Sequence, residues 1–280
     1  MIRYDLHLHT SASDGIYTPN EICTLAKEHG LVGISITDHD TVDAYHELTA
    51  EQRLMVIPGI EINTDYQGEE VHILGYFINI EHEPLLQKIE EIRKLRKNRL
   101  LKMVDKISGL GIPLTWEHVL NCAGNGSPGR AHIGMAMVHQ GLTSSIEEAM
   151  QRYLSRGAPA YVERYHFTPR EAILLIRAAG GSPVLAHPGL INSEQIIQEV
   201  IQMGVDGIEV YHTQHGPKQE EEYQLLAQRH SLLITGGSDF HGFIDERHAE
   251  FPGNKGLTEE KFADFLSKRK RIANKNVEFN

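Results

Sequence analysis

Cysteine is scarce in this sequence, with only Cys23 and Cys122 among 280 residues. Two cysteines are too few for the disulfide framework of a small secreted domain. The chain also lacks an apolar run of the about 18 residues that a membrane span needs, and its first residues show no signal-peptide pattern. These absences predict a protein of the reducing cytoplasm that does not enter a membrane.

Positive charge is in deficit, since 27 Lys and Arg residues face 38 Asp and Glu residues, a net charge of −11. Non-specific binding of duplex DNA depends on neutralising phosphates, so this composition disfavours it. Neither a Gly-x-Ser-x-Gly elbow nor a Walker phosphate loop occurs. Histidine is abundant, with 17 residues. Because imidazole is the commonest metal ligand and carries protons near neutral pH, the histidines are the functional lead.

Short apolar, β-branched runs alternate with amphipathic helical patterns, which predicts an α/β fold with a mainly parallel sheet or barrel. Seven candidate strands favour a closed or nearly closed barrel over a small open sheet. The expected strands are 4–9, 32–37, 55–61, 72–78, 184–187, 207–211 and 232–236. The expected helices between and after them are 19–29, 41–53, 168–179, 193–203, 217–230 and 258–268.

One stretch breaks this alternation, because residues 84–170 contain no pattern of a buried strand. We therefore expect a barrel formed by residues 1–83 and 171–280, with 84–170 as an inserted helical domain. The expected helices of the insertion are 84–108, 131–140 and 145–155, with a glycine-rich loop at 124–129. The insertion has 13 Lys and Arg against 7 Asp and Glu, a net of +6, whereas the rest of the chain has a net of −17. A basic insertion on an acidic body predicts a cap that faces an anionic substrate.

Histidine and carboxylate side chains gather where the expected strands end. His7 and His9 are two apart on one strand, so both point to the same face. The carboxyl ends of parallel strands meet at one face of a barrel, where active sites form. The groups at or just beyond these ends are His7, His9, Asp14, Asp38, His39, Glu61, His187, Asp239 and His241.

His72 begins its expected strand rather than ending it. Only a short polar segment separates it from Glu61, which suits a hairpin that returns His72 to the same face. So many charged and imidazole groups would be costly to bury without partners. Divalent cations remove that cost, and mixed imidazole and carboxylate ligands suit Zn, Mn or Fe. The sequence therefore predicts a metal site at the strand ends.

Five motifs occur in order: His-Leu-His, Thr-Asp-His-Asp, Pro-Gly-Ile-Glu, Leu-Ala-His-Pro-Gly and Gly-Ser-Asp-Phe-His. This set resembles the PHP family, the polymerase and histidinol phosphatase phosphoesterases, over most of residues 1–83 and 182–242. The resemblance implies a distorted seven-stranded (β/α) barrel that binds two to three divalent ions. It also implies that the protein hydrolyses phosphate esters. It assigns His7, His9, Glu61 and Asp239 to one ion, Glu61, His72 and His187 to a second, and Asp14, His39 and His241 to a third. Glu61 would bridge two of the ions and is the expected catalytic carboxylate.

The insertion narrows the resemblance to a bacterial branch similar to 3′,5′-nucleoside bisphosphate phosphatases and 5′-to-3′ exoribonucleases. Its Gly-Arg-Ala-His and Tyr-Leu-Ser-Arg-Gly motifs make Arg130, His132 and Arg156 the expected substrate-binding residues. We expect a nucleotide or short RNA as the substrate.

Two pairs of residues complete the expected site. His212 and His215 are both candidates for protonating the leaving group. Asp38 and Asp40 are expected to lie outside the set of metal ligands and to orient the imidazoles of that set.

Alternative functions remain at this point. A histidinol-phosphate phosphatase would share the metal site and differ in its pocket. A non-catalytic metal-binding module would hold ions without turnover. A polymerase-linked proofreading role is disfavoured, because no polymerase domain accompanies the chain.

Overall fold

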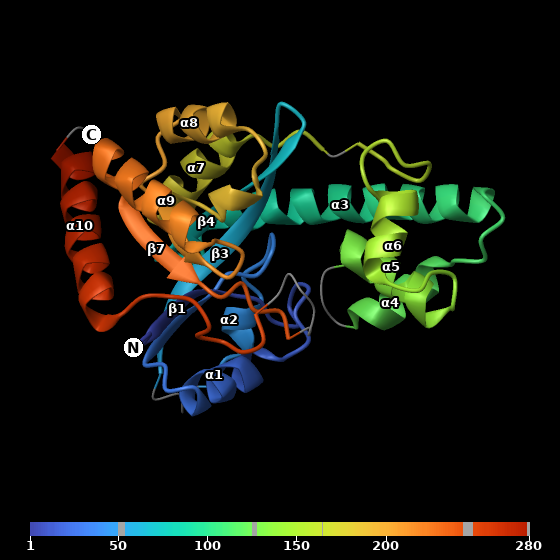
Figure 1. Ribbon diagram of the computed structural model, residues 1–280, viewed down its shortest axis with the longest axis horizontal. Coiled ribbons are helices and arrows are strands. Elements are labelled where there is room, and N and C mark those ends of the chain that lie inside the picture. Colours follow the sequence, from blue (N-terminus) through green and yellow to red (C-terminus); the bar gives the residue numbers. More distant parts are fainter. Residues whose placement is uncertain (50–53, 125–127, 164, 243–248, 279–280) are drawn as a thin grey trace.

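The seven strands join in chain order into one sheet that closes almost completely into a barrel (Figure 1). The computed structural model describes residues 1–280 except 50–53, 125–127, 164, 243–248 and 279–280. The strands are β1 (Tyr4–Leu8), β2 (Gly33–Ile36), β3 (Met55–Tyr66), β4 (Glu69–Tyr76), β5 (Ser182–Leu185), β6 (Gly207–His212) and β7 (Leu233–Gly237).

Closure occurs just beyond β7. There the Asp239 N–H donates to the His7 carbonyl at 2.9 Å, and the His9 N–H donates to the Phe240 carbonyl at 3.0 Å. Gly237 permits this approach, because a Cβ at that position would lie 2.3 Å from the Cβ of His7. The predicted seven-stranded α/β barrel is confirmed.

The hairpin expected to return His72 is present and is longer than predicted. Strands β3 and β4 pair antiparallel from Gly59 opposite Tyr76 to Tyr66 opposite Glu69. The two residues of the turn, Gln67 and Gly68, have φ of 52° and 82°. Two positive φ angles are the signature of the tight turn whose twist matches that of paired strands. The hairpin places His72 opposite Asn63, two residues beyond Glu61.

Most helices around the barrel lie close to their predicted positions. They are α1 (Pro19–Glu28), α7 (Pro169–Ala178), α8 (Glu194–Gln202), α9 (Pro217–His230) and α10 (Glu259–Glu278). Helices α1 and α7 begin at capping boxes, each with a threonine cap and a glutamate three residues later. Helix α10 extends ten residues beyond its predicted end at 268.

The predicted helix at 41–53 is wrong, because within the described residues 41–49 only the short α2 (Ala44–Glu47) is helical. Asn20 of α1 ends this helix. Its amide donates to the Glu47 carbonyl at 3.0 Å and accepts from the Thr49 N–H at 3.1 Å, so the backbone turns toward α1. Residues 50–53 lie outside the described part of the chain.

The described residues between β4 and α7 form helices joined by loops, with no strand among them, as predicted. They form α3 (Glu83–Gly109), α4 (Trp116–Ala123), α5 (Arg130–His139), α6 (Ile146–Ala149) and a π-helical turn, η1 (Met150–Leu154). Helix α4 is not predicted by the sequence pattern. Thr115 caps its start by accepting a hydrogen bond from the His118 N–H. Part of the predicted glycine-rich loop, residues 125–127, lies outside the described residues.

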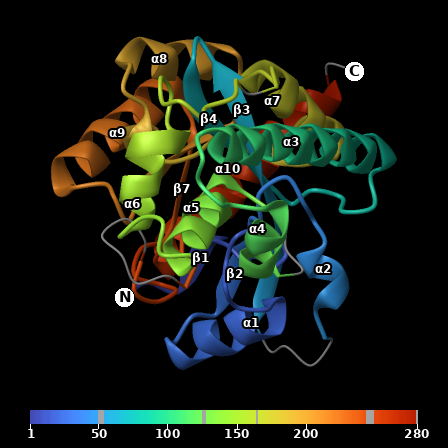
Figure 2. The ribbon, with the colours of Figure 1, turned by 90° about the vertical axis from the view of Figure 1, so that its right-hand side faces the viewer.

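Helix α3 connects two hydrophobic cores. Leu85, Ile89 and Ile92 pack into the core of the barrel, whereas Leu100 and Met103 belong to a separate core formed with α4 to η1. Figures 1 and 2 show the far half of α3 carrying α4, α5 and α6 beside the barrel. The proposed domain boundaries at 83 and 171 stay a prediction. Among the described residues, no helix is long and apolar enough to span a membrane.

Candidate metal centre

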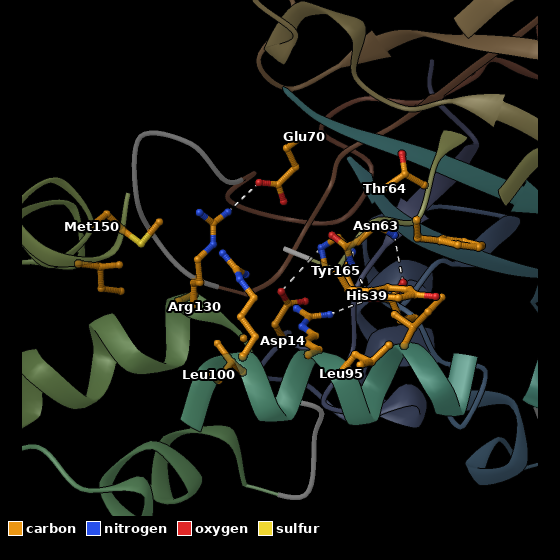
Figure 3. A pocket seen from close by; sticks show the side chains of 18 residues that line it. Asp14, His39, Asn63, Thr64, Glu70, Leu95, Leu100, Arg130, Met150 and Tyr165 are labelled. Atoms are coloured by element: carbon orange, nitrogen blue, oxygen red, sulfur yellow. Dashed lines mark hydrogen bonds and ion pairs between the residues drawn. The ribbon is translucent and has the colours of Figure 1, made fainter. Parts of the chain in front are cut away.

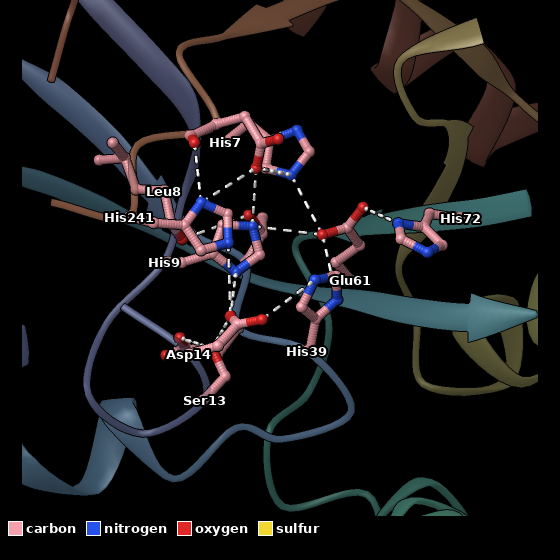
Figure 4. A network of polar contacts seen from close by, with 12 residues as sticks. His7, Leu8, His9, Ser13, Asp14, His39, Glu61, His72 and His241 are labelled. Atoms are coloured by element: carbon pink, nitrogen blue, oxygen red, sulfur yellow. Dashed lines mark hydrogen bonds and ion pairs between the residues drawn. The ribbon is translucent and has the colours of Figure 1, made fainter. Parts of the chain in front are cut away.

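The carboxyl ends of the strands hold a buried cluster of imidazoles and carboxylates (Figure 4). His7 and His9 are fully buried, and Glu61 is 1% exposed. The cluster joins β1, the loops after β2, β5 and β7, and both strands of the hairpin. All nine residues predicted as metal ligands lie within it.

The first group consists of His7, His9, Glu61 and Asp239. The Nε2 atoms of His7 and His9 each lie 3.2 Å from Glu61 Oε2. The same two atoms lie 3.2 and 3.1 Å from Asp239 Oδ1. Four donor atoms from three separate segments therefore converge on one point.

His9 gives the clearest sign that this group can hold a cation. Both of its ring nitrogens are buried, and neither makes a well-aligned hydrogen bond among the described residues, although Nε2 lies within 3.2 Å of Glu61 and Asp239. A buried polar atom without a partner costs about 1–3 kcal/mol, which a metal bond would recover. The donors are a mixture of imidazoles and carboxylates, the set that Zn, Mn and Fe accept. The residues present therefore fit a divalent ion.

The other oxygen of Glu61 faces a second pair of histidines. Glu61 Oε1 lies 2.8 Å from His72 Nδ1 and 2.9 Å from His187 Nε2. One carboxylate thus presents one oxygen to each of two donor groups, which is the geometry of a bridging ligand.

Asp14 organises the third group. Its Oδ1 lies 3.4 Å from His241 Nε2 and 3.7 Å from His9 Nδ1, and its Oδ2 lies 3.8 Å from His39 Nε2. This group is looser than the other two, and Asp14 is 15% exposed. It lies at the border between the cluster and the cavity described below.

The pKa values of these groups reflect both their burial and their charged neighbours. Burial by itself would raise the pKa values of Glu61 and Asp239, but nearby histidines hold both well below their usual ranges. Burial likewise lowers the pKa of His9, yet Asp239 and Glu61 outweigh it and raise that pKa to about 10. Carboxylates that stay ionised in a buried site are suitable ligands for a cation.

Three cluster positions have unusual backbone conformations. Asp40, His187 and Asp239 have φ of 52°, 23° and 54°. Residues other than glycine rarely adopt positive φ, and such strain concentrates at functional sites. Here it directs side chains at the strand ends toward one another.

Asp38 and Asp40 hydrogen-bond to side chains that lie between them and the cluster, and their expected role in orienting imidazoles stays a prediction. Asp38 accepts from the N–H and the hydroxyl of Thr10 at 2.7 and 2.6 Å, and so fixes the loop that carries Asp14. Asp40 accepts from the Asn63 amide at 2.8 Å, and that same amide lies 3.2 Å from His39 Nδ1. Both carboxylates therefore support the cluster through an intermediate residue.

His212 and His215 are buried and engaged within the protein. His215 Nδ1 lies 2.9 Å from the Val210 carbonyl, and its Nε2 accepts from the Gly189 N–H at 3.1 Å. His212 Nδ1 accepts from the Gln214 N–H at 3.2 Å, and its Nε2 lies 3.3 Å from Asp239 Oδ2. Because backbone groups hold both nitrogens of His215, this geometry does not favour it as a proton donor to a substrate. His212 instead contacts a predicted metal ligand.

A cavity of about 260 Å³ lies between the cluster and the inserted helices (Figure 3). Asp14 and His39 line it on the cluster side, and Arg96 and Arg130 line it on the side of the insertion. Its apolar lining comprises Ile92, Leu95, Leu100, Ile146, Met150, Tyr165 and Phe167. The cavity therefore combines the edge of the cluster, cationic side chains and an apolar wall.

Two series of polar contacts connect the insertion to the cluster across this cavity. Arg130, at the start of α5, donates to Glu70 at 2.7 Å, and Glu70 lies 3.0 Å from His72 Nε2. Arg96 of α3 lies 3.2 Å from Asp40. Each arginine thus reaches a carboxylate that supports a predicted ligand.

The other two predicted substrate residues lie elsewhere. His132 is buried, and its Nδ1 accepts from the Gly129 N–H at 2.9 Å, which caps α5. Arg156 is 59% exposed and donates to the Gly68 carbonyl at 2.8 Å, at the turn of the hairpin. Neither is among the described residues that line the cavity. Of the three predicted substrate-binding residues, Arg130 is the one whose position at the cavity favours contact with a substrate.

Three residues of the site, Glu209, Glu70 and Asn63, are outside the set that the sequence predicts. Glu209 is fully buried on β6 and contacts His7. A glutamate in the otherwise apolar run Gly-Ile-Glu-Val was the signal that could have identified it. Glu70 and Asn63 lie on hairpin positions that were not expected to be strand.

Known proteins resemble this chain over most of its length. The model of the PHP domain matches residues 5–163. The 5′-3′ exoribonuclease Rnm of Salmonella typhimurium is 33% identical over 248 residues, which cover 85% of each chain. The 3′,5′-nucleoside bisphosphate phosphatase of Chromobacterium violaceum is 30% identical over 263 residues, which cover 89% of this chain and 92% of that one.

A solved structure agrees with the sequence relatives. A protein of Bifidobacterium adolescentis, assigned as a metal-dependent phosphoesterase, superposes with a TM-score of 0.84 and 30% identity. The match covers 95% of this chain and 96% of that one. The strand order, the cluster at the strand ends and these relatives lead to one conclusion: the chain belongs to the PHP family and is a metal-dependent phosphoesterase.

Proposed function

We propose that this phosphoesterase hydrolyses phosphate esters of nucleotides, with 3′,5′-nucleoside bisphosphates and the 5′ end of short RNA as its substrates. The observation that carries the proposal is the cavity. It joins the edge of the cluster to Arg130 and to an apolar wall. A phosphate alone would need only the cluster and a cation, whereas a nucleoside also needs apolar surface against its base.

The similar proteins support this choice of substrate. One is named for removing nucleotides from RNA and another for hydrolysing nucleoside bisphosphates.

We assign two to three divalent ions, manganese, zinc or iron, to the cluster. His7, His9, Glu61 and Asp239 would hold the first ion, and Glu61, His72 and His187 the second. Asp14, His39 and His241 would hold the third. Bound divalent ions supply a Lewis acid for the phosphoryl oxygens and lower the pKa of water. Glu61 would offer one carboxylate oxygen to the first set of ligands and the other oxygen to the second set. It would thereby fix the distance between the two sets of ligands.

Arg130 is the proposed substrate-binding residue. Its planar guanidinium can donate two parallel hydrogen bonds to a phosphate. Glu70 holds this guanidinium at the mouth of the cavity, at 2.7 Å. Arg96 adds a second positive charge on the same side. The apolar wall excludes water around the base and the sugar.

A comparison of substrates tests the proposal. The specificity constant kcat/KM would be measured for adenosine 3′,5′-bisphosphate, a 5′-phosphorylated oligoribonucleotide, histidinol phosphate and p-nitrophenyl phosphate. We expect the two nucleotide substrates to exceed the other two. A preference for histidinol phosphate would overturn the assignment and leave the phosphoesterase chemistry in place.

We also propose that the enzyme works in the cytoplasm. The proposal rests on its cysteines, since Cys23 and Cys122 are both free thiols and Cys23 is buried. A reducing compartment keeps such thiols reduced.

A further inference from the structure

A buried carboxylate on β6 supports the cluster from outside the nine proposed ligands. Glu209 is fully buried. Its Oε1 and Oε2 lie 3.1 and 3.2 Å from Nδ1 of His7. Its Oε2 also accepts from the backbone N–H of His187 at 2.8 Å. One side chain thus contacts two of the predicted metal-binding histidines, one on β1 and one in the loop after β5.

The direction of these hydrogen bonds follows from the chemistry of the donors. The His187 N–H can only donate, so Glu209 Oε2 is an acceptor. An ionised carboxylate has no proton to give, so the proton between Glu209 and His7 resides on His7 Nδ1. The lone pair of a neutral His7 then resides on Nε2. That atom lies 3.2 Å from both Glu61 Oε2 and Asp239 Oδ1.

A neighbour on the same strand acts in a matching way. The Gln214 N–H donates to His212 Nδ1, so a neutral His212 carries its proton on Nε2. That nitrogen lies 3.3 Å from Asp239 Oδ2, which leaves Asp239 Oδ1 directed at His7 and His9. Strand β6 therefore orients ligands that belong to β1 and to the segment after β7.

We infer that Glu209 is a positioning residue for the metal centre. It holds His7 with the proton on Nδ1, so that Nε2 faces the ion with its lone pair. It also fixes the His187 backbone, whose φ is 23°. Carboxylates behind metal-binding histidines set the tautomer and strengthen the ligand, and their loss costs about 10- to 100-fold in metal affinity or activity. The inference rests on the proposed metal-binding role of His7.

The isosteric variant Glu209→Gln tests this role. The amide oxygen must stay on the His187 N–H, because an NH₂ group there would face another donor. The NH₂ group then faces His7 Nδ1 and favours a proton on Nε2, where the ion should bind. We expect the Kd for Mn²⁺, measured by calorimetry on chelator-treated protein, to rise about 10- to 100-fold.

Asp206→Asn is the matched control. Asp206 is a buried carboxylate just before β6, and it pairs with Arg177 instead of the cluster. Its loss should lower the thermal stability without changing the Kd for Mn²⁺. If Glu209→Gln folds and lowers the thermal stability but binds Mn²⁺ as tightly as the wild type, Glu209 is merely structural and the inference is overturned.

A measurement on the wild type covers the case in which Glu209→Gln does not fold. In the Zn²⁺-loaded protein, long-range ¹H–¹⁵N spectra would be assigned by comparison with His7→Gln. The proton of His7 should appear on Nδ1, and a proton on Nε2 would contradict the inference. Failure of the proposed metal-binding role of the cluster looks different, because the wild type would then bind neither Mn²⁺ nor Zn²⁺. Failure of the proposed nucleotide specificity would leave both the Kd for Mn²⁺ and the position of the His7 proton unchanged.

Discussion

The barrel and residues 84–170 face the same cavity with opposite charge. The insertion has a net charge of +6, and the remainder of the chain has −17. At the strand ends, buried imidazoles and carboxylates are packed against one another within about 3–4 Å. The insertion contributes arginines and apolar side chains on helices that have a hydrophobic core of their own.

This contrast suggests a division of labour. The strand ends provide chemistry that any phosphate ester can use. The insertion provides the contacts that distinguish one ester from another. The two parts meet through Arg130 with Glu70 and through Arg96 with Asp40. Variants on either side of the cavity should therefore have different consequences.

The largest loss should follow from changing Glu61 on the barrel side. Glu61→Gln removes the negative charge that faces two donor groups. Ion binding contributes several kcal/mol to the transition state, so kcat/KM should fall about 10³-fold or more on every phosphate ester. Activity on p-nitrophenyl phosphate and adenosine 3′,5′-bisphosphate would be measured together with the metal content.

An exposed glutamate serves as the control for Glu61. Glu222 on α9 is 56% exposed and pairs with Lys218 at 3.7 Å, outside the cluster, and Glu222→Gln should leave both activities unchanged. If Glu61→Gln lost activity on the nucleotide substrate alone, Glu61 would act in substrate recognition. That result would contradict the division of labour between the strand ends and the insertion.

The next largest effect concerns the core of the insertion. Ile133 on α5 is fully buried, and Ile133→Ala should lower the free energy of unfolding by about 2–5 kcal/mol through the cavity that it creates. Because this core is separate from that of the barrel, the metal content should not change. Denaturant unfolding and elemental analysis would measure the two quantities. Leu120→Ala, at a 41% exposed position in the same insertion, should cost less than about 0.5 kcal/mol. Loss of metal from Ile133→Ala would show that the two cores are not independent.

Arg130→Ala should separate recognition from chemistry. Loss of a charged hydrogen bond costs about 1.5–3 kcal/mol, which corresponds to roughly a ten- to hundred-fold fall in kcat/KM on nucleotides. The effect on p-nitrophenyl phosphate should be weaker, and the metal content should stay the same. Arg152→Ala is the control, because Arg152 is exposed and pairs with Glu148 inside the insertion. An equal, small loss on both substrates would mean that Arg130 does not contact the nucleotide.

Arg156→Ala should have the smallest effect. Arg156 was expected to bind substrate, yet it lies outside the cavity and contacts the hairpin turn. Exposed polar contacts of this kind contribute about 1 kcal/mol or less, so nucleotide kcat/KM should change less than about fivefold. Steady-state kinetics on adenosine 3′,5′-bisphosphate would suffice. A loss as large as that of Arg130→Ala would return Arg156 to the substrate site.

The cluster was predictable from sequence because its members follow a simple geometric rule. His7, His9 and Glu61 lie at the ends of short apolar runs, and the ends of parallel strands meet at one face. His72 required one further step, the hairpin, which the short separation from Glu61 suggested. Local pattern and barrel closure were sufficient for these residues.

The remaining features depend on contacts between distant segments. Asn20 ends α2 through a contact across 27 residues, which no local pattern contains. Glu209 reaches His7 across 202 residues, and only the closed barrel brings them together. Arg130 and Arg156 both lie in short motifs of the insertion, but the fold of α3 to η1 decides which of them lines the cavity. Sequence patterns alone could not separate these two arginines.

A metal titration tests the central claim most directly. Wild-type protein would be stripped with a chelator and titrated with Mn²⁺, while hydrolysis of adenosine 3′,5′-bisphosphate and p-nitrophenyl phosphate is followed in parallel. If the strand ends provide the common chemistry, both activities should vanish on stripping and return together in proportion to the bound ion. Full hydrolysis of either ester by the stripped protein would contradict the account.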